Sequence, residues 1–190
     1  MTRPWKRWLF RLSFAPIYVW HRLRRALGLG RDWLSEVEPG LYLAAMPTAA
    51  DAAALARRGV RAVVNACDEY RGPRAAYRRH GIAQLHVPII DFAEPTAEQV
   101  DSALAFLREH TAAGSGVLVH CKAGRGRSAT LVLCWLVAER GLDPEEAQRA
   151  LEAARPRVVR GLHRRAIVRE LHRRRLAAPE AQDSLTRRTS

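Results

Sequence analysis

The chain has 190 residues, of which 48% are hydrophobic, so it is long enough for one folded domain with a small appendage and apolar enough to bury a core. Its formal net charge of +13 favours an anionic partner: nucleic acid, an acidic membrane surface or a phosphorylated substrate. No apolar run approaches the roughly 18 residues of a membrane-spanning helix. The three cysteines are an odd number without metal-ligand spacing, which indicates a reducing compartment.

The first 31 residues combine eight cations with no acid and are rich in aromatic and aliphatic side chains. Trp and Tyr prefer the level of the lipid headgroups, and Arg pairs with anionic lipids, so residues 1–31 are predicted to lie on a membrane surface. The alternatives are a targeting segment or a solvated arm. We therefore expect a cytoplasmic, peripheral membrane protein, or one at the mitochondrial inner membrane if this segment is a transit peptide.

Residues 32–178 are predicted to form one domain in which strands alternate with helices. Strands are expected at 41–43, 60–65, 82–87 and 117–120, and helices at 49–58, 97–110, after Ser128, from Pro144 and at 161–176. This order predicts an α/β fold with a central, mostly parallel sheet flanked by helices. Ligands then bind at the carboxyl ends of the strands. The polar residues 179–190 are predicted to be disordered.

One loop joins the predicted strand that ends at His120 to the long apolar helix after Ser128. A strand, a tight loop and a helix N-terminus turn backbone N–H groups inward as an anion nest, and the helix dipole adds positive potential. The amides expected to bind phosphate belong to Lys122, Ala123, Gly124, Arg125, Gly126 and Arg127.

The side chains of this loop suit nucleophilic catalysis on a phosphate ester. A helix N-terminus and nearby cations would lower the pKa of Cys121, which makes the thiolate available as the nucleophile. Arg127 can offer a bidentate fork to two phosphoryl oxygens. Ser128 can hydrogen-bond the sulfur and help it leave, and Gly124 and Gly126 permit positive φ and close approach of the ligand.

The spacing His-Cys-x5-Arg-Ser resembles the signature of the cysteine-dependent protein tyrosine phosphatase superfamily. That resemblance implies a phosphatase with a general acid on a loop upstream of the cysteine. The candidate is Asp91, thirty residues before Cys121, with Glu94 as the second choice. No metal or cofactor is required, because the cationic loop supplies the charge stabilisation. His120 is expected to orient the loop by hydrogen bonding.

A second block, residues 59–73, together with Pro88 and residues 91–96, looks like the phosphatidylglycerophosphate phosphatases of mitochondria, plants and bacteria. This resemblance implies hydrolysis of phosphatidylglycerophosphate to phosphatidylglycerol, with an anionic phospholipid and a membrane surface as partners. Lys122, Arg125 and Arg71 could contact the lipid headgroup. Alternatively, Arg71, Arg74 and Arg78 belong to a solvated helix face.

Three other functions remain open. The same chemistry would serve a dual-specificity protein phosphatase, a phosphoinositide phosphatase or an RNA-directed enzyme. Nucleic acid is not the expected partner, because aromatic residues do not interleave with the basic helix 161–176. A catalytically dead binding protein is disfavoured because Cys121, Arg127, Ser128 and Asp91 are all present. The oligomeric state is left open.

The other two cysteines have separate predicted roles. Cys67 ends the strand expected beside the Cys121 strand, so it could form a reversible disulfide that protects the nucleophile, or it could be a buried structural thiol. Cys134 lies in the apolar helix and is predicted to be a core residue.

Overall fold

The computed structural model describes Val19, Leu23 and residues 33–186, with burial assigned through Ala177. The predicted membrane segment 1–31 lies outside these residues, apart from Val19 and Leu23. Within the described part of the chain, no helix is long and apolar enough to cross a membrane.

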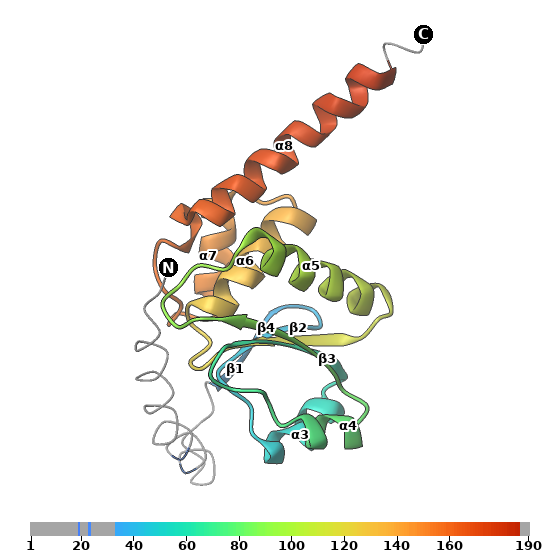
Figure 1. Ribbon diagram of the computed structural model, residues 1–190, viewed down its shortest axis with the longest axis vertical. Helices are drawn as coiled ribbons and strands as arrows, with labels where there is room; N and C mark the ends of the chain where they lie inside the picture. Colours follow the sequence, from blue (N-terminus) through green and yellow to red (C-terminus); the bar gives the residue numbers. More distant parts are fainter. Residues whose placement is uncertain (1–18, 20–22, 24–32, 187–190) are drawn as a thin grey trace.

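A five-stranded sheet forms the centre of the domain (Figure 1), in the spatial order β1-β2-β5-β3-β4. Strands β2, β5, β3 and β4 are parallel, and only the first pair is antiparallel, so the predicted mostly parallel sheet is confirmed. The strands are β1 (Leu34–Glu38), β2 (Leu41–Ala44), β3 (Val60–Cys67), β4 (Ala83–Ile89) and β5 (Gly116–His120).

Strand β1 was not predicted. It is an edge strand of sequence Leu-Ser-Glu-Val-Glu and is only partly buried, so it has no continuous apolar run to mark it. A tight turn at Pro39 and Gly40 pairs it with β2, and Gly40 has a φ of +80°, which glycine adopts without steric cost.

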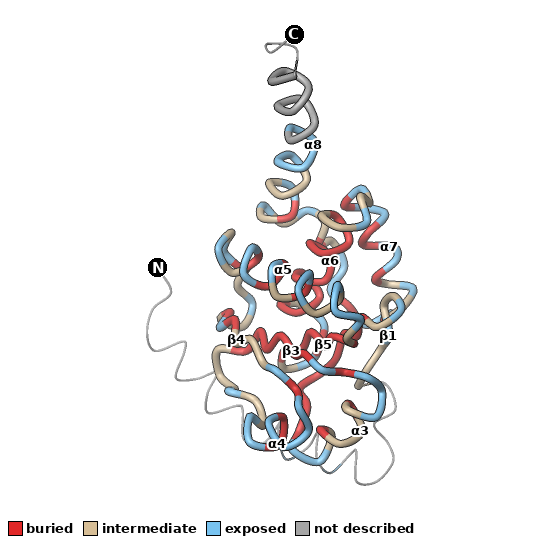
Figure 2. Tube along the Cα trace, turned by 90° about the vertical axis from the view of Figure 1, so that its right-hand side faces the viewer, coloured by how far each residue is buried: buried red, intermediate tan, exposed pale blue. Residues whose placement is uncertain are grey.

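Helices cover both faces of the sheet, as the alternating pattern predicted (Figure 1). The short helices lie on one face: η2 (Ala49–Asp51), α3 (Ala52–Arg57) and α4 (Arg74–Arg79). The longer helices lie on the other: α5 (Ala97–Ala112), α6 (Arg127–Glu139), α7 (Pro144–Ala154) and α8 (Ala166–Thr186). Most of the buried residues belong to the sheet and to α6 (Figure 2).

Helix α6 is the central element of the longer helical layer. Every residue from Arg127 to Val137 is buried, as expected for an apolar helix packed between the sheet and other helices. Cys134 is fully buried within it, so its assignment to the core is confirmed. The position of α6 fixes the helix N-terminus that follows the candidate catalytic loop.

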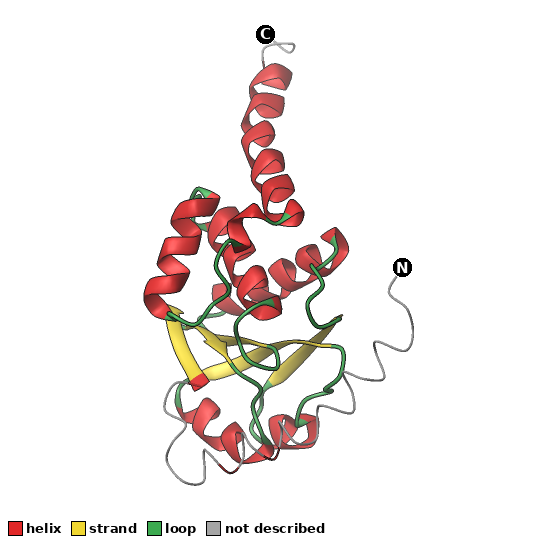
Figure 3. Cartoon of the chain, turned by 90° about the vertical axis from the view of Figure 1, so that its left-hand side faces the viewer, coloured by secondary structure: helices red, strands yellow, loops and turns green. Residues whose placement is uncertain are grey.

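The C-terminal region differs from the prediction at both ends. The basic helix begins at Ala166 rather than at residue 161, because Gly161 is left-handed (φ +79°) and Arg165 is extended, with a short η3 turn (Leu162–Arg164) between them. We predicted disorder from residue 179, but α8 continues to Thr186. Its outer half projects from the domain (Figure 3).

The parallel strands end at a common edge of the sheet. Ala44, His120 and Asn65 lie side by side in register, and Cys67 pairs with Ile89. The loops after these strand ends therefore meet at one place, although they are far apart in the sequence.

Candidate active site

Cys121 lies at the bottom of a cleft at this edge and is 3% exposed. The Ser128 hydroxyl donates to its sulfur at 3.2 Å, and the backbone N–H groups of Arg125 and Ser128 also hydrogen-bond it. The loop amides thus point at the sulfur, as the predicted anion nest requires.

Two opposing effects act on the pKa of Cys121. Burial raises it, because a thiolate loses hydration in a low-dielectric site. The charge of Arg127, the Ser128 hydroxyl and the two amides lower it by more, so the net shift is below the ordinary value of 9.0. Cys67 shows the opposite result, because burial and the nearby Cys121 raise its pKa well above 9.0. The nucleophilic form is therefore favoured at Cys121 alone of these two thiols.

The Arg127 guanidinium is held on three sides. Glu69 accepts from both terminal nitrogens at 2.7 and 2.8 Å, and the Ile89 carbonyl accepts at 3.0 Å. Asp91 forms an ion pair with it through Oδ1 at 3.0 Å. Within the described chain, the buried Nε of Arg127 has no hydrogen-bond partner. A buried donor without an acceptor is costly, so an oxygen of a bound ligand that reached this N–H would stabilise the site.

Glu69 is a residue that the sequence analysis missed. Its side chain is 4% exposed, and although burial raises its pKa, the hydrogen bonds and charge of Arg127 lower it by more. Asn65 fixes the turn that carries it: the side-chain amide donates to the Tyr70 carbonyl at 2.7 Å and accepts from the Cys67 amide at 3.0 Å. The sequence feature that could have indicated Glu69 is its position as an acidic residue just after the end of a predicted strand.

Arg155, also not predicted, supports the loop from behind. It is 6% exposed, and its guanidinium donates to the carbonyls of Gly124 and Ala123 at 2.8 and 3.3 Å and to Ser35 Oγ at 3.2 Å. Because the carbonyls point backward to Arg155, the N–H groups of the same peptides face the cleft.

The two loop glycines behave differently. Gly124 has a φ of +66°, and a Cβ there would lie 2.4 Å from the backbone of Ala44, so the predicted need for glycine is confirmed. Gly126 has a φ of −115°, and a Cβ would meet only Val159 Cγ2, at 4.0 Å. The prediction of positive φ at Gly126 is therefore wrong: this residue caps α6 with a negative φ and has space for a Cβ.

The cleft above Cys121 has a volume of about 450 Å³. Its walls come from the loop 121–127, the segment after β4 and the region before α8. They consist of Asp91, Phe92, Ala93, Lys122, Ala123, Arg125, Gly126, Arg127, Val159 and Arg165. The structure thus brings Asp91 together with the loop residues that the sequence predicted. Glu94, the second choice for the acid, does not line the cleft.

Four other predicted residues have different surroundings. Arg71 does not line the cleft but donates to His86 Nδ1 on β4 at 3.1 Å. Arg74 and Arg78 lie on the exposed face of α4, as the solvated-face alternative expected. His120 is fully buried, with Nδ1 3.5 Å from the Cys121 carbonyl oxygen and its ring edge-on to Tyr70.

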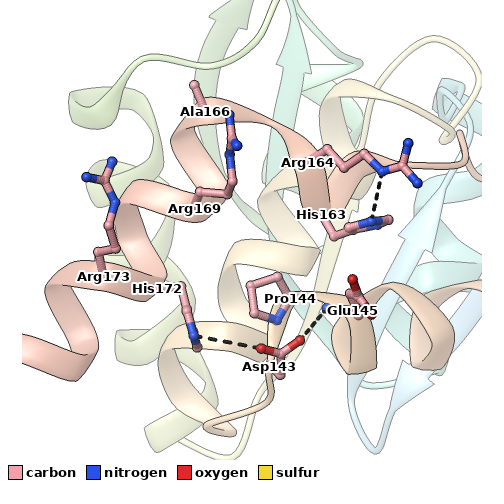
Figure 4. A pocket seen from close by; sticks show the side chains of 9 residues that line it. All are labelled: Asp143, Pro144, Glu145, His163, Arg164, Ala166, Arg169, His172 and Arg173. Atoms are coloured by element: carbon pink, nitrogen blue, oxygen red, sulfur yellow. Dashed lines mark hydrogen bonds and ion pairs between the residues drawn. The ribbon is translucent and has the colours of Figure 1, made fainter.

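A larger hollow of about 710 Å³ lies between the start of α7 and α8 (Figure 4). It is lined by basic side chains, including Arg169 and Arg173, and by an Asp143–His172 pair at 3.8 Å. It contains no cysteine, serine or threonine that could act as a nucleophile, so the chemistry belongs to the smaller cleft.

A thiol of lowered pKa, surrounded by inward-facing amides and by an arginine with a free donor, defines a cysteine-dependent phosphatase. The chain belongs to the family "Dual specificity phosphatase, catalytic domain", whose model matches residues 41–174. It is a phosphatase.

Three relatives illustrate the similarity. Phosphatidylglycerophosphate phosphatase PTPMT1 of Arabidopsis thaliana is 32% identical over 152 residues, which cover 78% of this chain and 45% of that protein. The chain thus spans less than half the length of this relative. Human Dual specificity phosphatase 28 is 36% identical over 124 residues, covering 65% of this chain and 68% of that protein. A crystal structure of PTPMT1 in complex with PI(5)P has a TM-score of 0.71 and 26% identity, covering 78% of this chain and 99% of that chain.

Proposed function

We propose that this phosphatase removes the terminal phosphate of phosphatidylglycerophosphate and releases phosphatidylglycerol. The observation that carries the proposal is the similarity over 78% of the chain to a plant enzyme named for this activity. The cleft supports it, because Lys122, Arg125 and Arg165 add positive charge around the Arg127 site, as a headgroup with two phosphates requires.

The proposed reaction has two steps. Arg127 and the amides of residues 122–127 hold the phosphoryl group while the Cys121 thiolate attacks phosphorus. The bond to the ester oxygen breaks, and Asp91 gives its proton to the leaving alkoxide. Water then attacks the cysteinyl-phosphate, Asp91 accepts the proton from that water, and the P–S bond breaks. The Ser128 hydroxyl, 3.2 Å from the sulfur, stabilises the departing thiolate.

A lipid substrate requires contact with a membrane surface. Phe92 and Val159 line the cleft and are 83% and 44% exposed, which gives the edge of the site an apolar character beside its cations. With the basic, aromatic segment 1–31, these residues support a cytoplasmic, peripheral membrane protein, or one at the mitochondrial inner membrane if the segment is a transit peptide. The proposal includes no nucleic-acid partner.

The test is phosphate release by the purified full chain from three substrates in parallel. Vesicles containing phosphatidylglycerophosphate should be hydrolysed with the highest kcat/KM, ahead of PI(5)P vesicles and a phosphotyrosine peptide. The Cys121→Ser protein is the matched control and should release no phosphate. A strong preference for the peptide would overturn the lipid assignment.

Two alternative functions have specific support. The 36% identity to human Dual specificity phosphatase 28 favours a protein substrate. The PTPMT1 structure in complex with PI(5)P favours a phosphoinositide. The same three-substrate assay distinguishes them, because each alternative predicts a different best substrate.

A further inference from the structure

Arg165 is a cation in the catalytic cleft that the reaction above does not use for phosphoryl transfer. It is the last residue before α8, and its side chain reaches α6, where one terminal nitrogen donates to Thr130 Oγ1 at 2.7 Å. The Thr130 hydroxyl in turn donates to the Gly126 carbonyl at 2.9 Å. Arg165 is therefore anchored to the base of the catalytic loop while it also lines the cleft.

The surroundings of Arg165 contain too little negative charge for a half-buried guanidinium. In the part of the chain that the structure describes, no carboxylate lies within ion-pair distance of it, whereas Arg127 contacts two carboxylates and Arg140 contacts one. Burial lowers the pKa of Arg165, and the charge of Glu94 opposes this shift only in part. A cation that loses hydration without gaining a partner is destabilising, and an anionic ligand in the cleft would restore the balance.

A second cation in the cleft is held in a similar way. Arg125 donates its Nε to the Arg157 carbonyl at 2.7 Å, and this contact fixes the direction of the side chain. In the described structure its terminal nitrogens have no carboxylate partner, and the side chain is exposed. Among the arginines of the cleft, the inner one, Arg127, is paired with carboxylates, and in the described structure the two outer ones, Arg125 and Arg165, are not.

We propose that Arg165, assisted by Arg125, binds a second phosphate of the substrate while the Cys121 loop holds the phosphate that is removed. This inference rests on the proposed function: in phosphatidylglycerophosphate the second phosphate is the phosphodiester, three glycerol carbons from the terminal monoester. Arg165 would then be a specificity-determining residue that distinguishes such a headgroup from a simple monoester.

The experiment uses two soluble esters that share the same leaving alcohol unit. Glycerophosphoglycerophosphate, the deacylated headgroup, has the phosphodiester, and glycerol 3-phosphate lacks it. The quantity measured is the ratio of their kcat/KM values. Wild type should prefer the first ester, and Arg165→Gln should lower the ratio by about 10- to 100-fold, as expected for loss of a charge-assisted hydrogen bond. The loss should appear mainly in KM, and Arg165→Lys should recover part of it.

The matched control is Arg164→Gln, which removes an exposed arginine one residue away whose Nε donates to His163 and which does not line the catalytic cleft. It should leave the ratio unchanged. A ratio near one in wild type, or an equal loss on both esters in Arg165→Gln, would overturn the inference. Thermal unfolding of each variant shows whether an equal loss reflects misfolding. Failure of the vesicle assay, with a substrate ratio that still depends on Arg165, would refute the lipid assignment alone.

Discussion

The ion pair between Glu69 and Arg127 offers the sharpest test of how this site is held together. Both side chains are almost fully buried, at 4% and 2% exposed. Removing one partner of a buried pair typically costs about 3–5 kcal/mol. In Glu69→Gln the amide oxygen keeps one acceptor, and Asp91 still lies 3.0 Å from Arg127, so we expect a loss of about 2 kcal/mol in the free energy of unfolding.

The same substitution should lower the catalytic rate by a larger factor than the loss of folding stability alone would cause. Without its bidentate partner the Arg127 fork can rotate, and a displaced phosphate-binding group costs on the order of a hundredfold in rate. We expect kcat/KM to fall about a hundredfold and the unfolding temperature by about 4–8 °C for a domain of this size. The assays are hydrolysis of p-nitrophenyl phosphate and thermal unfolding by circular dichroism.

The control for this variant is Glu109→Gln, which removes an exposed carboxylate on α5 far from the cleft. It should change neither quantity. Wild-type activity and stability in Glu69→Gln would refute the argument that Glu69 positions Arg127.

Three further predictions follow from the site. Gly124→Ala should destabilise the fold by about 1–3 kcal/mol and reduce activity, because the new Cβ would overlap the backbone of Ala44. Gly126→Ala should be tolerated, and chemical denaturation of the two variants compares their stabilities. The stabilisation that Glu69 provides should be complete above its ordinary pKa of 4.5 and disappear as the pH falls through its lower folded-state value, so the stability difference between wild type and Glu69→Gln should shrink in acid. Iodoacetamide should alkylate Cys121 with a pH midpoint below 9.0 and leave Cys67 unmodified in the native protein. Peptide mapping identifies the labelled cysteine, and labelling of both would contradict the opposite pKa shifts.

Local patterns in the sequence were enough to predict the centre of the site. The strand that ends at His120, the loop and the apolar helix form a continuous stretch whose residue types identify both the structure and the chemistry. Asp91 could be predicted because it follows a strand end, and parallel strands end at one edge. The helices predicted at 97–110 and from Pro144 begin at Ala97 and Pro144, each after an N-cap residue whose side chain accepts a backbone N–H.

The supporting residues could not be predicted, because their roles depend on contacts between distant segments. Glu69 and Arg127 are 58 residues apart, and Arg155 lies 31 residues from the Gly124 carbonyl to which it donates. Each looks like an ordinary surface residue in the sequence, and only the packing of loops at the strand ends buries it. The headgroup role of Arg71 stays a prediction; the contact of this side chain with His86, 15 residues away, is another one that the sequence does not reveal.

The Cys67–Cys121 disulfide stays a prediction. Both thiols are free and buried in the structure, and Cys67 ends the strand adjacent to the one that precedes Cys121, as expected. Peptide mapping after peroxide treatment would decide it, and the absence of a crosslink would rule it out.

The pairing of Asp91 with Arg127 has a consequence for turnover. In the unliganded enzyme this carboxylate occupies one donor of the group that must receive the incoming phosphate. Because Asp91 is part of the same chain, it competes with phosphate groups for Arg127 as an intramolecular ligand. Its effective concentration does not change as substrate is consumed. At the end of the second step Asp91 carries the proton that it took from water. Once it releases this proton, its carboxylate can pair with Arg127 again and compete with the free phosphate, which favours departure of the product and limits product inhibition.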